Sequence, residues 1–137
     1  FIEEKMRKEN LGNITITGFL SYEKAMELTL AAPVVFECMK KSLTTMVAQP
    51  VKILDYAALG KAMALSDISE ISYELGRNGG ALVSDPEDID AFVDNIYKLL
   101  ENYRLRKQIG QKAKELVKNN TWEDQGRKLV ELYEEFK

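Results

Sequence analysis

A proline-led segment at residues 50–56 (PVKILDY) contains the first residues whose types and spacing suggest chemistry. If it opens a helix after a parallel strand, it places backbone N–H groups and the positive end of the helix dipole at the carboxyl edge of the sheet. Val51 and Lys52 would lie in the first turn, where the ammonium can pair with a phosphate. Asp55, one turn further on, can accept hydrogen bonds from the vicinal hydroxyls of a ribose. The spacing also fits an ordinary solvated surface helix.

A glycine followed by aromatic residues at 18–22 (GFLSY) is the second candidate. Gly18 would permit close approach of the backbone to a ligand, and Phe19 or Tyr22 could stack on a nucleobase. The alternative is a glycine that the turn requires, with the aromatic rings packed beneath it.

The acidic residues Glu37, Asp67, Glu70 and Glu74 form a third candidate. Paired carboxylates can perform acid–base catalysis or bind a divalent cation. However, Glu70 and Glu74 are one helical turn apart, which fits a solvated helix face better, and we predict no metal site. We interpret the aromatic residues near the C-terminus, Trp122 and Tyr133, as core and interface packing.

Composition excludes several classes of function. The chain has 137 residues, 45% of them hydrophobic and 30% charged, with a net charge of −3, which describes one globular domain and gives no basic footprint for nucleic acid. It contains no histidine, so histidine bases and His-ligated metals are excluded within it. The single Cys38 cannot form an internal disulfide and suits a reducing compartment. No apolar run approaches the roughly 20 residues of a membrane span.

The elements that must position the candidate residues alternate between strand and helix, which predicts a parallel sheet with helical crossovers. We expect strands at 14–17, 34–36, 62–65 and 81–83. We expect helices over 1–11, from Ser21 to Pro33, from Pro50 to Leu59, over 68–75, from Asp85 to Glu101, over 103–118 and from Thr121 onward. Residues 37–49 contain no clear element.

Residue preferences set the expected helix ends. Pro50 and Pro86 are placed at first helical positions, where a proline costs least. Thr121 is expected to cap the last helix, with Asp124 at the capping-box position. The apolar side of that helix is expected to contain Leu129, Leu132, Tyr133 and Phe136.

Four segments occur in an order typical of one family. Residues 13–23 (NITITGFLSYE) resemble the N-V-x-F-T-G-F-x-S-x-E stretch of family 4 (group 1) retaining glycosyltransferases. Residues 50–61 (PVKILDYAALGK) resemble their P-x-K-x-x-E-Y-x-A-x-G-K-P-V-V segment. Residues 79–86 (GGALVSDP) are similar to the N-G-x-L-V-x-P-x-D turn, and residues 121–133 to the closing F-S-W-E…L-Y-E-E-L helix. The resemblance covers nearly the whole chain.

The resemblance implies the C-terminal, donor-binding domain of a GT-B enzyme, an α/β fold in which two Rossmann-like domains, each a parallel sheet with flanking helices, face each other across a cleft. By this resemblance Asp55 stands where a glutamate contacts the ribose hydroxyls, and Val51 and Lys52 where the helix N-terminus meets the diphosphate. Gly18 and Phe19 stand in the loop near the base. The donor would be a nucleoside diphosphate sugar, with no other cofactor and no metal, and the sugar would keep its anomeric configuration.

The sequence departs from the family pattern at several positions. Many relatives have two glutamates eight residues apart, but the first position is Val47 here and the second, Asp55, is one methylene shorter. Residues 61–64 (KAMA) replace K-P-V-V. The basic pair that binds the diphosphate in the family has no match, and no catalytic residue is assigned.

The family domain also begins with two strands upstream of the helix over 1–11. Without them, in a sheet ordered 3-2-1-4-5-6, the strand at 14–17 is separated from the other three by two empty places. We therefore expect residues 1–137 to be a single nucleotide-sugar-binding domain, incomplete at its N-terminus, with an acceptor-binding domain missing. Self-association is plausible for such an incomplete sheet. This chain alone should transfer nothing, and the intact protein is expected in the cytoplasm or peripheral to a membrane.

Three alternatives stay open at this point. The first is a catalytically inactive Rossmann-like binding or scaffold domain that kept the fold and lost the site, which Val47 favours. The second is a related sugar-nucleotide epimerase, which would need acid–base residues that are not seen here. The third is an unrelated α/β module of the response-regulator kind, which would need clustered aspartates at strand ends, whereas only Asp67 has such a place.

Overall fold

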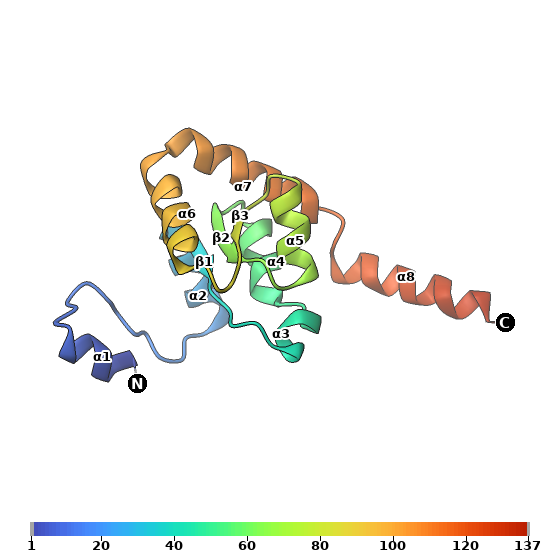
Figure 1. Ribbon diagram of the computed structural model, residues 1–137. Helices are drawn as coiled ribbons and strands as arrows, with labels where there is room; N and C mark the ends of the chain where they lie inside the picture. Colours follow the sequence, from blue (N-terminus) through green and yellow to red (C-terminus); the bar gives the residue numbers. More distant parts are fainter. Residues whose placement is uncertain (1, 137) are drawn as a thin grey trace.

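Three short parallel strands form the centre of the molecule, in the order β1-β2-β3. They are β1 (Val35–Glu37), β2 (Met63–Ser66) and β3 (Leu82–Ser84) (Figure 1). The computed structural model describes residues 2–136. All four residues of β2 are buried, as expected for the middle strand of a parallel sheet that is covered on both faces. The sheet and its crossovers confirm the predicted α/β fold.

Helices cover both faces of this sheet. On one face, α4 (Val51–Ala58) and α5 (Glu70–Arg77) contribute Ile53 and Leu75 to a cluster with Met63. On the other face, α6 (Ile89–Glu101) packs Phe92 and Leu99 near Ala64. The long helix α7 (Tyr103–Val117) joins the two clusters, because its Ile109 belongs to the second and its Ala113 and Val117 to the first.

The crossing of α4 and α7 depends on two glycines. Gly60 ends α4 with a φ of +68°, a conformation that favours glycine. Gly110 of α7 lies so close that a Cβ added there would collide with the Gly60 carbonyl oxygen. The two helices can therefore approach only because Gly110 has no side chain.

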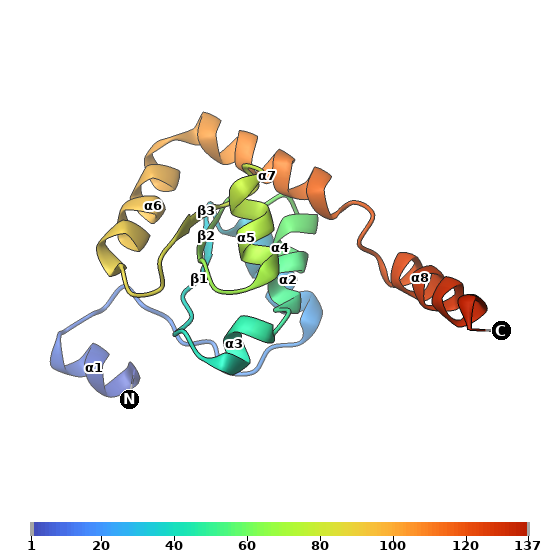
Figure 2. The same cartoon turned by 45° about the vertical axis from the view of Figure 1, so that its right-hand side comes forward.

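The terminal helices do not join this packing. Both α1 (Ile2–Lys8) and α8 (Trp122–Glu135) bury no residue and extend away from the sheet (Figures 1 and 2). Trp122 is 85% exposed and Tyr133 is exposed too. Our interpretation of these two aromatic residues as core packing is therefore wrong for residues 2–136, although the helix and its Thr121–Asp124 capping box are confirmed. Phe1, included in the predicted first helix, lies outside the described residues.

The expected strand at 14–17 does not form, so the sheet has three strands where the pattern predicted four. Ile14 and Ile16 are exposed, and the segment has no strand beside it in the described part of the chain. A β-branched run becomes a strand only when a neighbour satisfies its backbone N–H and C=O groups. The local pattern alone therefore did not produce a strand.

Residues 37–49 were expected to be irregular but contain a short helix, α3 (Leu43–Val47). Its start is a reciprocal cap in which the Ser42 hydroxyl accepts from the Thr45 N–H and the Thr45 hydroxyl accepts from the Ser42 N–H. Threonine replaces the usual glutamate or glutamine of a capping box, so the pattern was easy to miss.

The helices α4 and α6 both begin after the proline that was predicted to be their first residue. Pro50 is the N-cap residue of α4, and α4 begins at Val51. Pro86 lies in a turn in which the Asp85 carboxylate accepts a hydrogen bond from the Glu87 N–H, and Asp88 then caps α6. An Asx-turn therefore uses the residues that the sequence assigned to a first helical turn.

The helix α2 (Tyr22–Ala31) begins as predicted, with the Ser21 hydroxyl accepting from the Lys24 N–H. It has no fully buried residue. Polar contacts at both of its ends fix it to the α4 region, as described below.

Candidate functional site

The N-terminus of α4 lies at the carboxyl side of the sheet, with Val51 and Lys52 exposed in its first turn. The Lys52 ammonium forms an ion pair with the Glu37 carboxylate, with 2.5 Å between Nζ and Oε1. Glu37 is the last residue of β1 and is only 6% exposed. Lys52 is thus held above the carboxyl end of β1, and a phosphate at the α4 N-terminus would compete with Glu37 for it.

Glu37 differs from the other acidic residues grouped with it. Its second oxygen, Oε2, is buried and has no hydrogen-bond partner within residues 2–136. By contrast, Asp67, Glu70 and Glu74 are exposed, as a solvated face predicts. The solvated face proposed for Glu70 and Glu74 therefore does not extend to Glu37. The Glu37–Lys52 pair was missed because sequence alone does not show that the end of β1 meets the start of α4.

Asp55 is half-buried on the second turn of α4, and it accepts a hydrogen bond from the Tyr22 hydroxyl at 3.1 Å. This hydrogen bond, together with the negative charge of Asp55, raises the pKa of Tyr22. Tyr22 was considered only as a stacking residue. Because the two residues are 33 positions apart, no periodic pattern could have paired them.

The turn at residues 18–21 directly precedes Tyr22, the residue that contacts Asp55. Gly18 has a φ of +66°, and Phe19 is fully exposed. The alternative in which Phe19 packs beneath the turn is therefore wrong. Three residues of chain span at most about 11 Å, so Phe19 lies within that distance of Tyr22 and hence near α4. The structure thus places Val51, Lys52 and Asp55 on the first two turns of α4 and Gly18 and Phe19 in the exposed turn before Tyr22, although it tests none of their roles.

The far end of α2 is fixed by Lys61, which follows α4. Its ammonium donates hydrogen bonds to the backbone carbonyls of Leu30, at 3.0 Å, and Ala32. These carbonyls belong to the C-terminus of α2, where a cation also interacts favourably with the helix dipole. Partial burial lowers the pKa of Lys61. The helix α2 is therefore tied to the α4 region by Lys61 at one end and by Tyr22 at the other.

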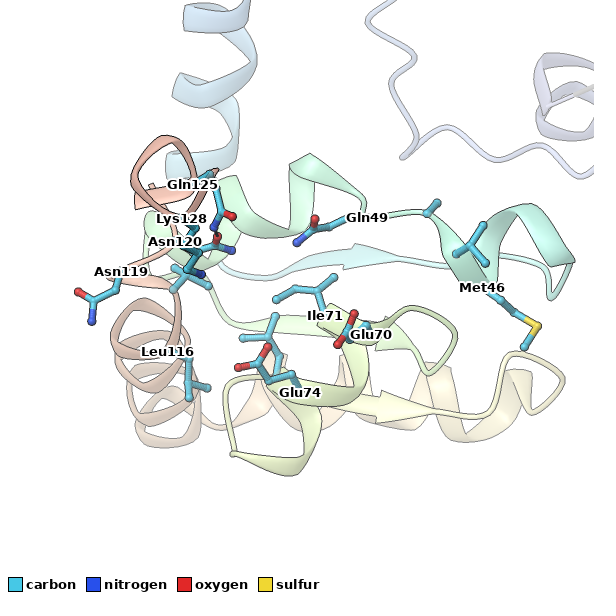
Figure 3. Close-up of a pocket in the computed structure, with 14 residues that line it drawn as sticks. Met46, Gln49, Glu70, Ile71, Glu74, Leu116, Asn119, Asn120, Gln125 and Lys128 are labelled. Atoms are coloured by element: carbon cyan, nitrogen blue, oxygen red, sulfur yellow. Dashed lines mark hydrogen bonds between the residues drawn. The ribbon is translucent and has the colours of Figure 1, made fainter. Parts of the chain in front are cut away.

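Two cavities adjoin this region. One, of about 780 Å³, lies between α4, the end of α7 and the start of α8, and has Val51, Asp55 and Trp122 in its wall. The other, of about 720 Å³, is polar and contains none of the predicted binding residues. Figure 3 shows Gln49 facing Ile71 across this second cavity, with amide side chains from the α7–α8 junction at one end.

Other kinds of site receive no support from the described residues. Within residues 2–136 no group of three or more cysteine, aspartate or glutamate side chains is placed to bind a metal ion. In the same range, no helix is long and apolar enough to cross a bilayer. Val47, at the position where the resemblance implies a glutamate, is 85% exposed at the end of α3.

Comparison with known proteins agrees with the fold. Residues 1–116 match the family Glycosyl transferases group 1. No curated protein sequence matches the chain significantly. The structure is similar to sucrose-phosphate synthase from Thermosynechococcus elongatus, with a TM-score of 0.84 at 20% sequence identity. The match covers 98% of this chain, α1 and α8 included, and 33% of that enzyme, so this chain spans about a third of its length.

Proposed function

The chain belongs to the glycosyl transferases group 1 family, and from this premise we propose that it is the donor-binding half of a retaining glycosyltransferase with a GT-B fold. The ligand would be a nucleoside diphosphate sugar bound at the N-terminus of α4. The arrangement around Asp55 is the observation that supports this assignment, because its carboxylate lies one turn from the exposed start of α4 and accepts a hydrogen bond from Tyr22, the residue that follows the turn at 18–21.

Each part of the donor has a matching group in this proposal. The backbone N–H groups of the first turn of α4, at Val51 and Lys52, would donate hydrogen bonds to the diphosphate, since helix N-termini bind anions. Lys52 would share its charge between the phosphate and Glu37. Asp55 would accept hydrogen bonds from the ribose hydroxyls, and the exposed Phe19 ring beyond Gly18 would lie against the base.

Transfer would proceed with retention of the anomeric configuration. The departing nucleoside diphosphate would be stabilised by the α4 N-terminus and Lys52, which are fixed before the reaction begins. The acceptor would bind on a second domain across the cleft, because the family builds its active site between two halves. The transfer activity, the acceptor and the sugar are therefore properties of the full-length protein.

The test is a calorimetric or NMR titration of the full-length protein with UDP, GDP and ADP. We expect saturable binding of one nucleotide, and an affinity at least about tenfold weaker in Asp55→Ala, the size of effect typical when a charged hydrogen-bond acceptor is removed. Asp94→Ala, which removes an exposed aspartate from α6, is the matched control and should leave the affinity unchanged. Equal binding by wild type and Asp55→Ala would overturn the assignment.

A second candidate is a domain that binds the nucleotide without transferring a sugar. It is favoured by the exposed valine at position 47, where the resemblance implies a carboxylate, and by the pairing of Lys52 with Glu37. Incubation of the full-length protein with a radiolabelled nucleoside diphosphate sugar distinguishes the two. In the absence of another acceptor the sugar passes to water, so time-dependent release of free sugar and nucleoside diphosphate supports the transferase, whereas binding with no release over many hours supports the inactive domain.

A further inference from the structure

We infer that Tyr22 is a positioning residue that orients the Asp55 carboxylate toward the two ribose hydroxyls of the donor. The inference rests on the proposed function, in which Asp55 binds the ribose. Its basis is the hydrogen bond from the Tyr22 hydroxyl to Asp55 Oδ1, at 3.1 Å, which joins the first residue of α2 to the second turn of α4.

The geometry of a carboxylate explains what this bond can do. An ionised aspartate has two oxygens and about four acceptor positions. The Tyr22 hydroxyl uses one position on Oδ1, and Oδ2 has no partner within residues 2–136. The terminal torsion of aspartate has broad minima, so an unheld carboxylate samples many orientations. A fixed donor on Oδ1 restricts this rotation and leaves acceptor positions for two neighbouring hydroxyl groups.

Tyr22 can serve as a fixed donor because α2 itself is fixed. The Ser21 hydroxyl caps the first turn, and the Lys61 ammonium binds the Leu30 and Ala32 carbonyls at the other end. The phenol therefore extends from a helix whose first turn is capped and whose far end is anchored to the residue that follows α4. Groups held in this way before a ligand arrives bind with a smaller loss of conformational freedom.

A purely structural role explains the contact poorly. The hydrogen bond is exposed to solvent and α2 buries no residue, so the bond adds little to the stability of the fold. The substitution Tyr22→Phe removes the donor and keeps the ring. It should therefore leave the fold intact and change only what the Asp55 carboxylate binds.

The experiment compares each ribonucleotide with an analogue that lacks the hydroxyls. Dissociation constants of UDP, GDP and ADP and of their 2′,3′-dideoxy counterparts are measured on the full-length protein. The variants are Tyr22→Phe and Asp55→Asn, with Tyr97→Phe, an exposed tyrosine on α6, as the control. We expect Tyr22→Phe to weaken ribonucleotide binding about threefold to tenfold, the effect of one hydrogen bond, without changing dideoxynucleotide binding. Asp55→Asn should remove the preference for the ribonucleotide, and Tyr97→Phe should change neither constant.

Each other outcome has a definite meaning. If Tyr22→Phe weakens both nucleotides equally, Tyr22 only supports the fold and the inference is wrong. If Asp55→Asn removes the ribonucleotide preference and Tyr22→Phe keeps it in full, the proposed function stands and the inference fails. If Asp55→Asn keeps the preference, or if no nucleotide binds, the proposed function fails and the inference fails with it.

Discussion

The helices α6 and α8 have similar sequence patterns but different environments. Both are amphipathic, and each begins at a side-chain cap, Asp88 in one case and Thr121 in the other. Nevertheless α6 buries Phe92 and Leu99 against the sheet, whereas α8 buries no residue. Caps and periodicity determine that a helix forms and which of its faces is apolar. They do not determine what covers that face, which depends on the rest of the fold.

The largest effect expected from this difference concerns one leucine from each helix. Leu99 of α6 is fully buried, and Leu99→Ala should lower the free energy of unfolding of the 137-residue chain by about 2–5 kcal/mol, because it removes buried apolar contacts and leaves a cavity. Leu129 of α8 is 51% exposed, so Leu129→Ala should change the free energy of unfolding by less than about 0.5 kcal/mol.

Urea denaturation followed by circular dichroism measures both values. A loss for Leu129→Ala close to that for Leu99→Ala would show that α8 packs against the rest of this chain in solution. The contrast between the two helices would then be wrong.

Two glycines extend the comparison to backbone contacts. Gly110 of α7 lies against the Gly60 carbonyl, so Gly110→Ala must push α4 and α7 apart and should cost about 1–3 kcal/mol. Gly126 of α8 has open space around its Cβ position, and Gly126→Ala should stabilise that helix by about 0.5–1 kcal/mol. Thermal unfolding of both variants tests the pair, and a destabilising Gly126→Ala would mean that a close neighbour lies against α8.

One charged side chain, Glu37, lies in the packed region of the described residues beside its apolar side chains and a few buried serines. Glu37 is buried with one unpartnered oxygen, and its partner Lys52 is more than half exposed. Replacing a buried ion pair with apolar groups is often neutral or stabilising. We therefore expect Glu37→Met to leave the melting temperature unchanged or to raise it, with Lys52 remaining in solvent. In the proposed site the freed Lys52 should also bind diphosphate more tightly, which the nucleotide titration measures.

A clear loss of stability in Glu37→Met would contradict this expectation. It would mean that the Glu37–Lys52 pair holds the start of α4 onto β1. The contrasting variant is Lys52→Met, which leaves a buried carboxylate without its cation. It should lower the free energy of unfolding, by less than the roughly 3–5 kcal/mol that breaking a fully buried pair costs, because Lys52 is partly solvated.

The sequence predicted local structure better than it predicted contacts between distant residues. The β-branched and apolar runs located all three observed strands, and Ser21 and Thr121 correctly marked two helix starts. The run at 14–17 failed because a strand requires a neighbour, and propensity contains no information about one. The five predicted binding residues were named from motifs, and their roles stay a prediction. The contacts of Lys52 with Glu37 and of Asp55 with Tyr22 depend on how strands and helices pack, which the motifs do not show.

The smallest expected effect concerns the contact between α2 and the packed region. The Asp55 carboxylate accepts a hydrogen bond from the Tyr22 hydroxyl and would repel a phenolate, so the pKa of Tyr22 lies above its ordinary value of about 10. Because the folded-state pKa is raised, this contribution to stability is complete below pH 10 and is lost as the pH rises through the raised pKa. Asp55→Asn removes the charge and should return the pKa of Tyr22 toward 10.

Ultraviolet titration measures this shift when the curve of Tyr22→Phe is subtracted from that of the wild type, which isolates one of six tyrosines. If Asp55→Asn leaves the pKa of Tyr22 unchanged, the two side chains do not stay in contact in solution. In that case Lys61 alone would anchor α2. The N-terminus of α2 would then, like α8 and unlike α6, make no lasting contact with the packed region.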